Sequence, residues 1–172
     1  LPGTTWLGFN PTGPRHPAQS QCQSTVQRQF GSGYVLDSIP EPFHRHNASF
    51  ETDPQYLEER EAHKELAGRL IAIHRLKTTA RGLDAIIGKE AFDHIQDMWA
   101  EDGNRHRWSV AFPIVETYRV VGRPKAKSVL SERQYRRLYQ RSSATLRVLN
   151  DDERVALASL ELEPLPTSNA WI

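Results

Sequence analysis

The stretch WSVAFPIVETYRVV, residues 108–121, carries the strongest strand signal in the chain and decides its fold. β-Branched and aromatic residues recur along it, and residues of these types favour extended strands that pack on a core. Pro113 interrupts the stretch, and a proline inside a strand marks a bulge or a bend because it cannot donate a backbone hydrogen bond. We therefore expect a long strand that bends near Pro113.

Shorter elements flank this strand on both sides. Asp53 and Pro54 predict the start of a helix, as N-cap and first helical residue, and Gly68 predicts its end. Ser131 and Asn150 are expected to cap two later helices, the second with acidic residues in its first turn, as the helix dipole favours. We expect strands at 4–9, 33–39, 68–79 and 143–149, helices at 54–67, 88–100, 131–140 and 151–163, and an irregular tail at 164–172.

Short strands therefore alternate irregularly with short helices, and Gly and Pro turns separate them. This order predicts an α+β fold, a strongly bent sheet or partial barrel with helices on its outside. A doubly wound parallel sheet fits less well, because the alternation is irregular and the chain has no glycine-rich phosphate loop. A length of 172 residues is typical of a single domain over 1–172.

Composition excludes several classes of protein. Hydrophobic residues make up 38% and charged residues 25% of the chain, which excludes wholesale disorder. The chain has no run of 18 apolar residues, so we expect no membrane partner. Its start, LPGTTWLGFN, lacks the pattern of a signal peptide and has no Met, which is typical of a fragment or a processed chain. The single cysteine, Cys22, excludes an internal disulfide and predicts a reducing, cytoplasmic location.

The net charge of +1 hides an asymmetry between two parts of the chain. Residues 105–147 contain eleven arginines and lysines but two acids, Glu116 and Glu132, whereas residues 51–65 are mainly acidic. A one-sided basic surface attracts phosphates and steers polyanions toward it. The pattern predicts a polyanion-binding surface in the second half of the chain. The alternative is a solvated basic face without a partner.

The tryptophans narrow the class of polyanion. The stretch MWAEDGNRHRWS places Trp99 and Trp108 around a loop that carries Arg105 and Arg107. Aromatic rings stack on bases while arginine engages phosphates, and an extruded base is held between such rings. The alternative is that these tryptophans fill the core. Their combination with interleaved arginines favours a nucleic-acid site.

Two loops add candidate contacts. HRHN, residues 44–47, offers His46 and Asn47 as donors and acceptors for a base edge. Its two histidines lack further ligands at metal-binding spacing, so we expect no metal and no cofactor. GRPKAKS, residues 122–128, is a basic loop suited to a phosphate backbone. The predicted backbone contacts are Arg105, Arg107, Arg119, Arg123, Lys125, Lys127 and Arg141.

The second half of the chain resembles the EVE family, a branch of the PUA-like folds related to YTH and ASCH domains. The resemblance runs over roughly 66–163 and rests on three stretches: AGRLIAIHRLK, the Trp-led RWSVAFPIVETY, and QRSSATLRVLNDDERVALASLE. Residues 1–50 match the family poorly, although Trp6-Leu7 corresponds to its opening strand. The segment 79–104 is longer than the family pattern.

The resemblance implies a PUA-like, strongly bent barrel whose pocket accepts a flipped, modified base. In YTH relatives an aromatic cage holds a methylated adenine, and modified cytosines are proposed ligands of EVE relatives. Some EVE members are fused to nucleases in modification-dependent restriction systems. By position, Trp99 is the first cage candidate and Trp6 the next, while Trp108 matches the strand-leading Trp. Arg141 and Thr145 match the closing signature.

We therefore expect a non-catalytic reader of a modified base, methylated or hydroxymethylated cytosine or N6-methyladenine, with DNA favoured over RNA. A fused or associated nuclease would be its partner. Two alternatives remain open. The first is an ASCH-like hydrolase acting on RNA or a nucleoside, against which the lack of a compact nucleophile–base motif counts. The second is a module whose basic helix binds an acidic protein.

Overall fold

Strand β5 (Val110–Val120) organises the sheet, because four of the five other strands pair with it. Strands β3 (Leu70–Leu76) and β4 (Arg81–Gly82) pair with one of its edges. Strands β1 (Trp6–Phe9) and β6 (Leu162–Leu165) pair with the other edge, and β2 (Val35–Ser38) pairs with β3. All these pairings are antiparallel. The long strand expected at 108–121 is thus confirmed.

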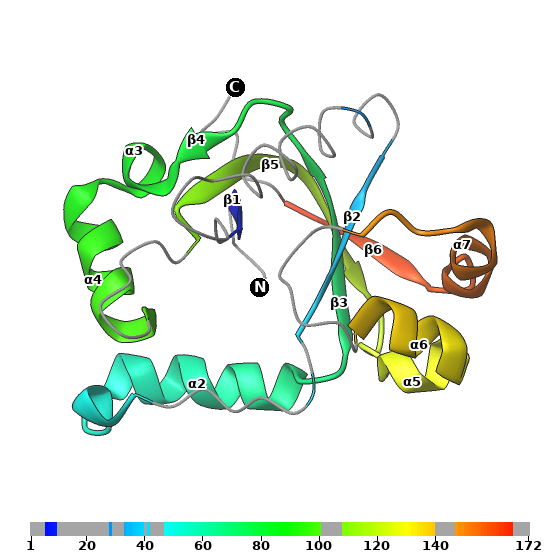
Figure 1. Ribbon diagram of the computed structural model, residues 1–172, viewed down its shortest axis with the longest axis horizontal. Helices are drawn as coiled ribbons and strands as arrows, with labels where there is room; N and C mark the ends of the chain where they lie inside the picture. Colours follow the sequence, from blue (N-terminus) through cyan, green and yellow to red (C-terminus); the bar gives the residue numbers. More distant parts are fainter. Residues whose placement is uncertain are drawn as a thin grey trace.

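The computed structural model describes residues 6–9, 28, 33–39, 41, 47–100, 108–139 and 147–166. Over these residues the fold is α+β, with the sheet curled into a half-barrel and helices around it (Figure 1). The expected fold class is therefore confirmed at this level. None of the described helices is both long enough and apolar enough to cross a bilayer.

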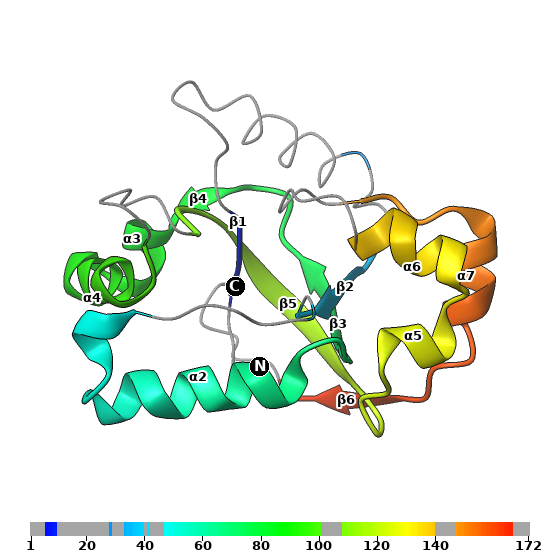
Figure 2. The ribbon, with the colours of Figure 1, turned by 60° about the horizontal axis from the view of Figure 1, so that its bottom comes forward.

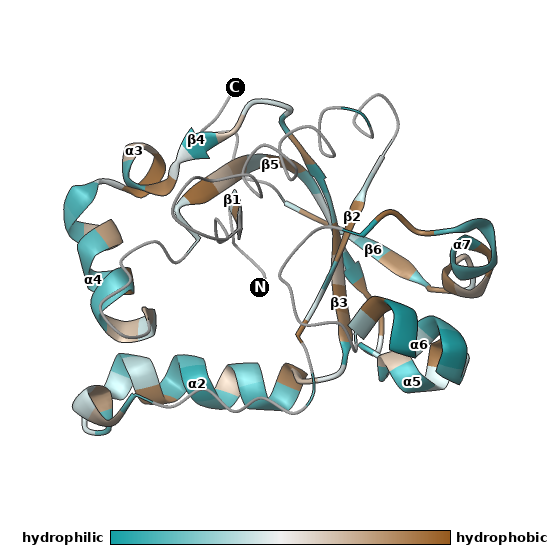
Figure 3. Cartoon of the chain, in the orientation of Figure 1, coloured by the Kyte–Doolittle hydropathy of each residue, from teal (hydrophilic) through white to brown (hydrophobic). Residues whose placement is uncertain are grey.

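The helices form two groups at opposite ends of the curled sheet, as both ribbon views show (Figures 1 and 2). One group consists of α2 (Pro54–Leu66), α3 (Leu83–Ile87) and α4 (Lys89–Trp99), with a short 3₁₀ turn at Ala48–Phe50. The other consists of α5 (Ala126–Val129), α6 (Glu132–Tyr139) and α7 (Asp151–Leu157). Polar residues gather on the outer sides of these helices (Figure 3).

Local sequence signals place the helix ends as expected. The side chain of Asp53 accepts a hydrogen bond from the Tyr56 N–H and caps α2. Gly68 follows the helix with a φ of 72°, a conformation that glycine adopts without strain. Asn150 and Glu153 form a capping box at the start of α7. These three predictions are confirmed.

Two bulges curl the sheet. Arg75 pairs with Glu116 and Leu76 with Ile114, so Val115 is an extra residue on β5. A second shift between Asp37 and Ser38 leaves an extra residue on β3. Bulges increase the local twist of a strand pair. Pro113 itself pairs in register with Trp6, and the bulge lies two residues further along β5, at Val115.

Apolar residues on the two faces of the sheet form separate cores. Phe112, Ile114 and Leu76 are almost completely buried and pack with Leu7 and Val35. A second core joins the start of β3 and the end of β5 to α5 and α6; its buried members are Leu70, Val120, Ala126, Leu130 and Tyr135. Specific packing on both faces favours this register, since a slip by one residue would move each side chain to the opposite face and away from its packing partners.

Two sequence predictions need correction. The last helix, expected to end at 163, ends at Leu157, and Leu162–Leu165 forms β6. Pairing with the open edge of β5 satisfies the backbone there and overrides the local preference of the segment. Residues 147–149, expected to end a strand, have no regular structure. The Val148 carbonyl instead accepts from Arg137, and Asn150 is an N-cap.

A buried ion pair joins α6 to α7. The Arg137 guanidinium donates to both carboxylate oxygens of Glu153, whose side chain is completely buried. The hydrogen bonds from Arg137 lower the pKa of Glu153, and the Asn150 N–H donates to the same carboxylate at 2.9 Å. A buried carboxylate without its partner is costly, so this pair fixes the position of α7.

We expect Arg137→Ala to lower the free energy of unfolding by about 2 kcal/mol, because it leaves the Glu153 carboxylate buried without a cation. This loss is smaller than for a fully buried ion pair because the Arg137 side chain is 40% exposed. Arg136→Ala on the same helix removes an exposed pair with Glu132 and should cost less than about 0.5 kcal/mol. Urea unfolding of both variants measures the difference, and equal losses would contradict this role of Arg137.

Candidate functional site

The structure brings together the three tryptophans predicted to hold a base. Trp6 and Trp108 approach the same point on β1, next to Gly8. A Cβ on Gly8 would lie 2.6 Å from the Trp108 Cβ and 2.8 Å from the Trp6 ring, so this approach requires glycine. The Trp108 and Trp99 ring centroids are 6.4 Å apart. We call Trp6, Trp99 and Trp108 the tryptophan cluster.

Trp99 is the buried member of the tryptophan cluster. It is 6% exposed and packs against Tyr56 and Met98, with ring centroids 5.1 Å apart in the pair with Tyr56. Its indole N–H donates to the Glu59 carboxylate at 3.1 Å. Trp6 and Trp108 are half-buried. Trp99 therefore supports the cluster from behind, and the accessible ring surface belongs to the other two tryptophans.

Trp108 has an unusual backbone. Its φ is 50°, in the left-handed region that bulky residues rarely adopt. Residues held in this region cost free energy and occur preferentially at functional sites. Here the conformation lies directly before β5 and places the Trp108 side chain over Gly8, between Trp6 and Trp99.

His63 on α2 supplies a polar ring beside the tryptophan cluster. Its ring centroid is 5.5 Å from that of Trp99, and its Nδ1 lies 2.6 Å from the Glu59 carbonyl oxygen. Glu59 thus contacts both rings, through its carbonyl and its carboxylate. The cluster therefore combines indole faces with an imidazole and a carboxylate, the two kinds of group that stacking and hydrogen bonding to a base require.

Asn47 lies beside the cluster and has a structural role. Its side-chain amide donates to the carbonyls of Asp97 and Met98 and accepts from the Ser49 N–H. Its backbone N–H donates to the Tyr56 hydroxyl at 2.6 Å. These bonds join the 3₁₀ turn to the end of α4 and to α2. The predicted contact of Asn47 with a base edge would require some of them to break.

A buried polar group, which sequence reasoning missed, joins three strands. His74 on β3 is 2% exposed, and its Nδ1 lies 3.0 Å from the Thr117 hydroxyl on β5. Its Nε2 lies 3.7 Å from the carboxylate of Asp37 on β2. Both ring nitrogens thus face polar partners, as a buried imidazole requires. Because Thr117 is only 8% exposed, its hydroxyl is poorly placed to attack a substrate.

Opposing effects act on the Asp37 carboxyl group. Its burial would raise the pKa, but the hydrogen-bonding contact with His74 and nearby positive charge, including His63, outweigh burial and lower it. The Asp37 carboxylate is therefore stabilised in its charged form. His63, which also contacts Trp99, lies near enough to contribute to this shift.

Among the described residues, most of the cations of the predicted basic surface are paired with acids. Arg119 pairs with Glu163, and both Lys125 and Lys127 pair with Glu41. The basic helix face is also compensated, because Arg136 and Arg137 bind Glu132 and Glu153. Arg123 and Arg133 have no acidic partner among the described residues.

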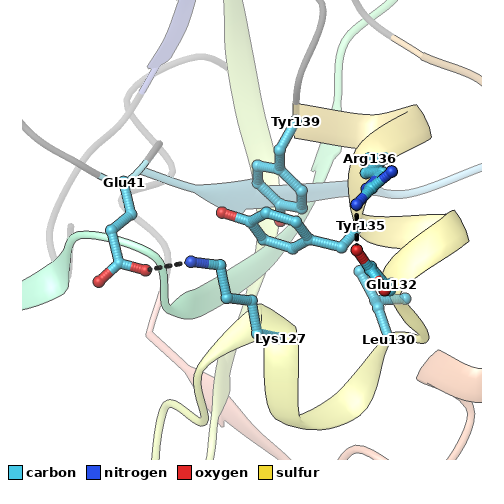
Figure 4. A pocket seen from close by; sticks show the side chains of 7 residues that line it. All are labelled: Glu41, Lys127, Leu130, Glu132, Tyr135, Arg136 and Tyr139. Carbon is cyan, nitrogen blue, oxygen red and sulfur yellow. Dashed lines mark hydrogen bonds and ion pairs between the residues drawn. The ribbon is translucent and has the colours of Figure 1, made fainter.

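A cavity of about 450 Å³ lies where Glu41 faces α5 and α6. Figure 4 shows Lys127 and Glu41 meeting on one side of the Tyr135 ring and Arg136 with Glu132 on the other. Lys127, one of the residues predicted to contact the nucleic-acid backbone, reaches this cavity. Its remaining lining residues are Leu130 and Tyr139.

Several predicted contacts fall outside the described residues. They are His46, Arg105, Arg107 and Arg141, together with Thr145 of the closing signature. Of the others, the structure brings Trp6, Trp99 and Trp108 together and places Asn47 next to Trp99 through Met98. Lys125 and Lys127 converge on Glu41, whereas Arg119 pairs separately with Glu163.

Comparisons of the chain with protein-family models, with curated proteins and with solved structures found no match.

Stability should depend on pH through Asp37. Because its pKa is lower in the folded than in the unfolded state, it stabilises the fold above the unfolded pKa, and this contribution is lost as pH falls through the folded pKa. We expect the free energy of unfolding to fall as the pH drops below about 5, and to fall less steeply in Asp37→Asn. Denaturant unfolding across this range measures both slopes. Identical slopes would contradict the role of Asp37.

Proposed function

We propose that the chain is a nucleic-acid-binding module that reads a modified base on the tryptophan cluster. The observation that carries the proposal is the convergence of Trp6 and Trp108 on Gly8, with Trp99 behind them. Aromatic rings give about 1–3 kcal/mol per stacked base. A half-buried pair of indoles on a buried aromatic support is suited to this task, because the support limits ring motion.

Polar groups next to the rings support the same proposal. A flipped base presents a polar edge as well as a face, and both must be satisfied when it leaves the stack. His63 and Glu59 lie beside Trp99 and could contact such an edge. The EVE-like stretches of the sequence and the half-barrel agree with a PUA-like reader, which is part of the proposal.

The basic residues of the second half support binding of a nucleic-acid strand more weakly than the sequence suggested. The Arg119–Glu163 pair is exposed at both side chains, and exposed ion pairs contribute little to stability. A phosphate can therefore replace the carboxylate at small cost. Arg123 and Arg133 add positive charge without an acidic partner among the described residues. We propose DNA carrying a modified cytosine or adenine as the ligand.

Single substitutions in the tryptophan cluster test the base site. Trp6→Ala and Trp108→Ala should each weaken binding of a duplex with the preferred modified base by at least about fivefold, because each removes an indole face. The preferred base is first identified with an array of methylated, hydroxymethylated and unmodified oligonucleotides in DNA and RNA, read by fluorescence polarisation.

The control for this test is Tyr34→Ala. Tyr34 is an aromatic residue that is 50% exposed and packs against Tyr118 rather than a tryptophan. It should bind the modified duplex as the unsubstituted chain does. Wild-type affinity in both tryptophan variants, or loss of affinity in the Tyr34 variant alone, would contradict the proposed site.

Trp99→Ala is unsuitable as the main test, because truncating a buried Trp costs about 3–5 kcal/mol of stability.

Binding should also depend on salt. The logarithm of affinity falls with the logarithm of salt concentration by about 0.9 for each phosphate neutralised. If Arg123 and Arg133 each neutralise one phosphate, the affinity should fall about tenfold between about 50 mM and about 200 mM salt. Polarisation titrations at several salt concentrations measure the slope. A slope near zero would exclude a contribution of the basic residues to strand binding.

A further inference from the structure

The cavity between Glu41 and α6 uses none of the residues of the tryptophan cluster or of the His74 group. Its volume of about 450 Å³ lies within the range of small-molecule sites. Leu130 and Tyr135, 4% and 7% exposed, form an apolar floor. Charged side chains line the rim, with Lys127 on one side and Arg136 on the other (Figure 4).

The charges at one end of this cavity do not balance. The Glu41 carboxylate lies 3.0 Å from the Lys125 ammonium and 3.4 Å from that of Lys127, so one anion faces two cations. Lys125 also donates to the Ala67 carbonyl at 2.7 Å, which anchors it away from the cavity. Lys127 has the longer contact with Glu41 and is 60% exposed. It therefore provides positive charge that Glu41 does not fully compensate.

The aromatic floor holds the Lys127 ammonium in place. Its nitrogen lies 5.1 Å from the centroid of the Tyr135 ring, within the range of a cation–π contact. Tyr135 in turn stacks on Tyr139 at 4.7 Å, and the Tyr139 hydroxyl donates to Ser38 at 2.9 Å. The ammonium is thus directed over the cavity by a ring stack that is fixed to β2.

Contacts with Gly68 and with two lysines fix the position of the Glu41 side chain. A Cβ at Gly68, whose φ is 72°, would lie 2.8 Å from a Glu41 carboxylate oxygen. Hydrogen bonds from Lys125 and Lys127 lower the pKa of Glu41, so it remains an anion. A carboxylate held against two lysines supplies the same kind of oxygen acceptors that a phosphate would supply.

We propose that this cavity binds a phosphodiester group of the nucleic-acid strand through Lys127, and that Glu41 competes with it by occupying Lys127 in the free protein. A phosphodiester carries one negative charge, which matches the charge that Glu41 leaves uncompensated. The apolar floor suits the sugar attached to it. The source of the phosphate rests on the proposed function, whereas the cavity and the competition do not.

Two substitutions with opposite expected effects test the proposal. Glu41→Gln removes the competing anion and should raise affinity for a labelled oligonucleotide about threefold, while Lys127→Ala should lower it about fivefold. The matched controls are Glu61→Gln, a carboxylate paired with Lys64 on α2, and Lys89→Ala, a lysine paired with Asp93 on α4. Both controls should change affinity less than about twofold. A gain in affinity cannot arise from unfolding.

Equal affinities of E41Q and E61Q, or of K127A and K89A, would overturn the proposal. If Trp6→Ala abolishes oligonucleotide binding while K127A leaves it intact, the proposed function stands and this inference fails. A titration with inorganic phosphate, followed by the NMR signals of Lys127 and Tyr135, distinguishes a free phosphate from a nucleic-acid strand as the ligand of the cavity. If it shifts them more in E41Q than in the unsubstituted chain while no oligonucleotide binds, the competition stands, but its source is a free phosphate and the proposed function fails.

Discussion

Backbone hydrogen bonding along both edges of β5 is the interaction on which the rest of the structure depends. On one edge β5 pairs with β1 and β6, which come from opposite ends of the sequence. The pairing with β1 places Trp6 and Gly8 next to the start of β5, where Trp108 closes the tryptophan cluster. On the other edge, the pairing with β3 aligns Thr117 with His74. Both polar and aromatic groups are therefore positioned by the same strand.

The same pairing changes the meaning of the charge pattern. Arg119 and Glu163 are distant in sequence but lie opposite each other because β5 pairs with β6. Glu41 reaches Lys125 and Lys127 from the end of β2. Counting acids within 105–147 therefore overstated the free positive charge of that segment. What remains is local: Arg123 and Arg133 have no acidic partner among the described residues, and Glu41 only partly compensates Lys127 over the Tyr135 ring.

Sequence reasoning succeeded where the signal was local and failed where it depended on tertiary pairing. Asp53, Gly68 and Asn150 set helix ends through bonds within a few residues, and β5 has a long β-branched stretch. The strand at 162–165 was predicted as the end of a helix and the start of an irregular tail, because the edge of β5 that stabilises it is invisible in sequence.

For the site, Trp99 and Trp108 were found from their basic neighbours, and Trp6 from the family resemblance. The buried polar group of Asp37, His74 and Thr117 was missed, although Asp37 and His74 were both visible as ionisable residues inside apolar strand stretches, VLDS and LIAIHRL.

The proposed base site requires that a base contacts Trp6 and Trp108 over Gly8. A photo-cross-linking experiment tests this contact, with a duplex that carries a photoreactive analogue of the preferred base at the modified position and mass-spectrometric identification of the linked residue. We expect links to Trp6 or Trp108; links confined to Tyr34 or Tyr118 would contradict this contact.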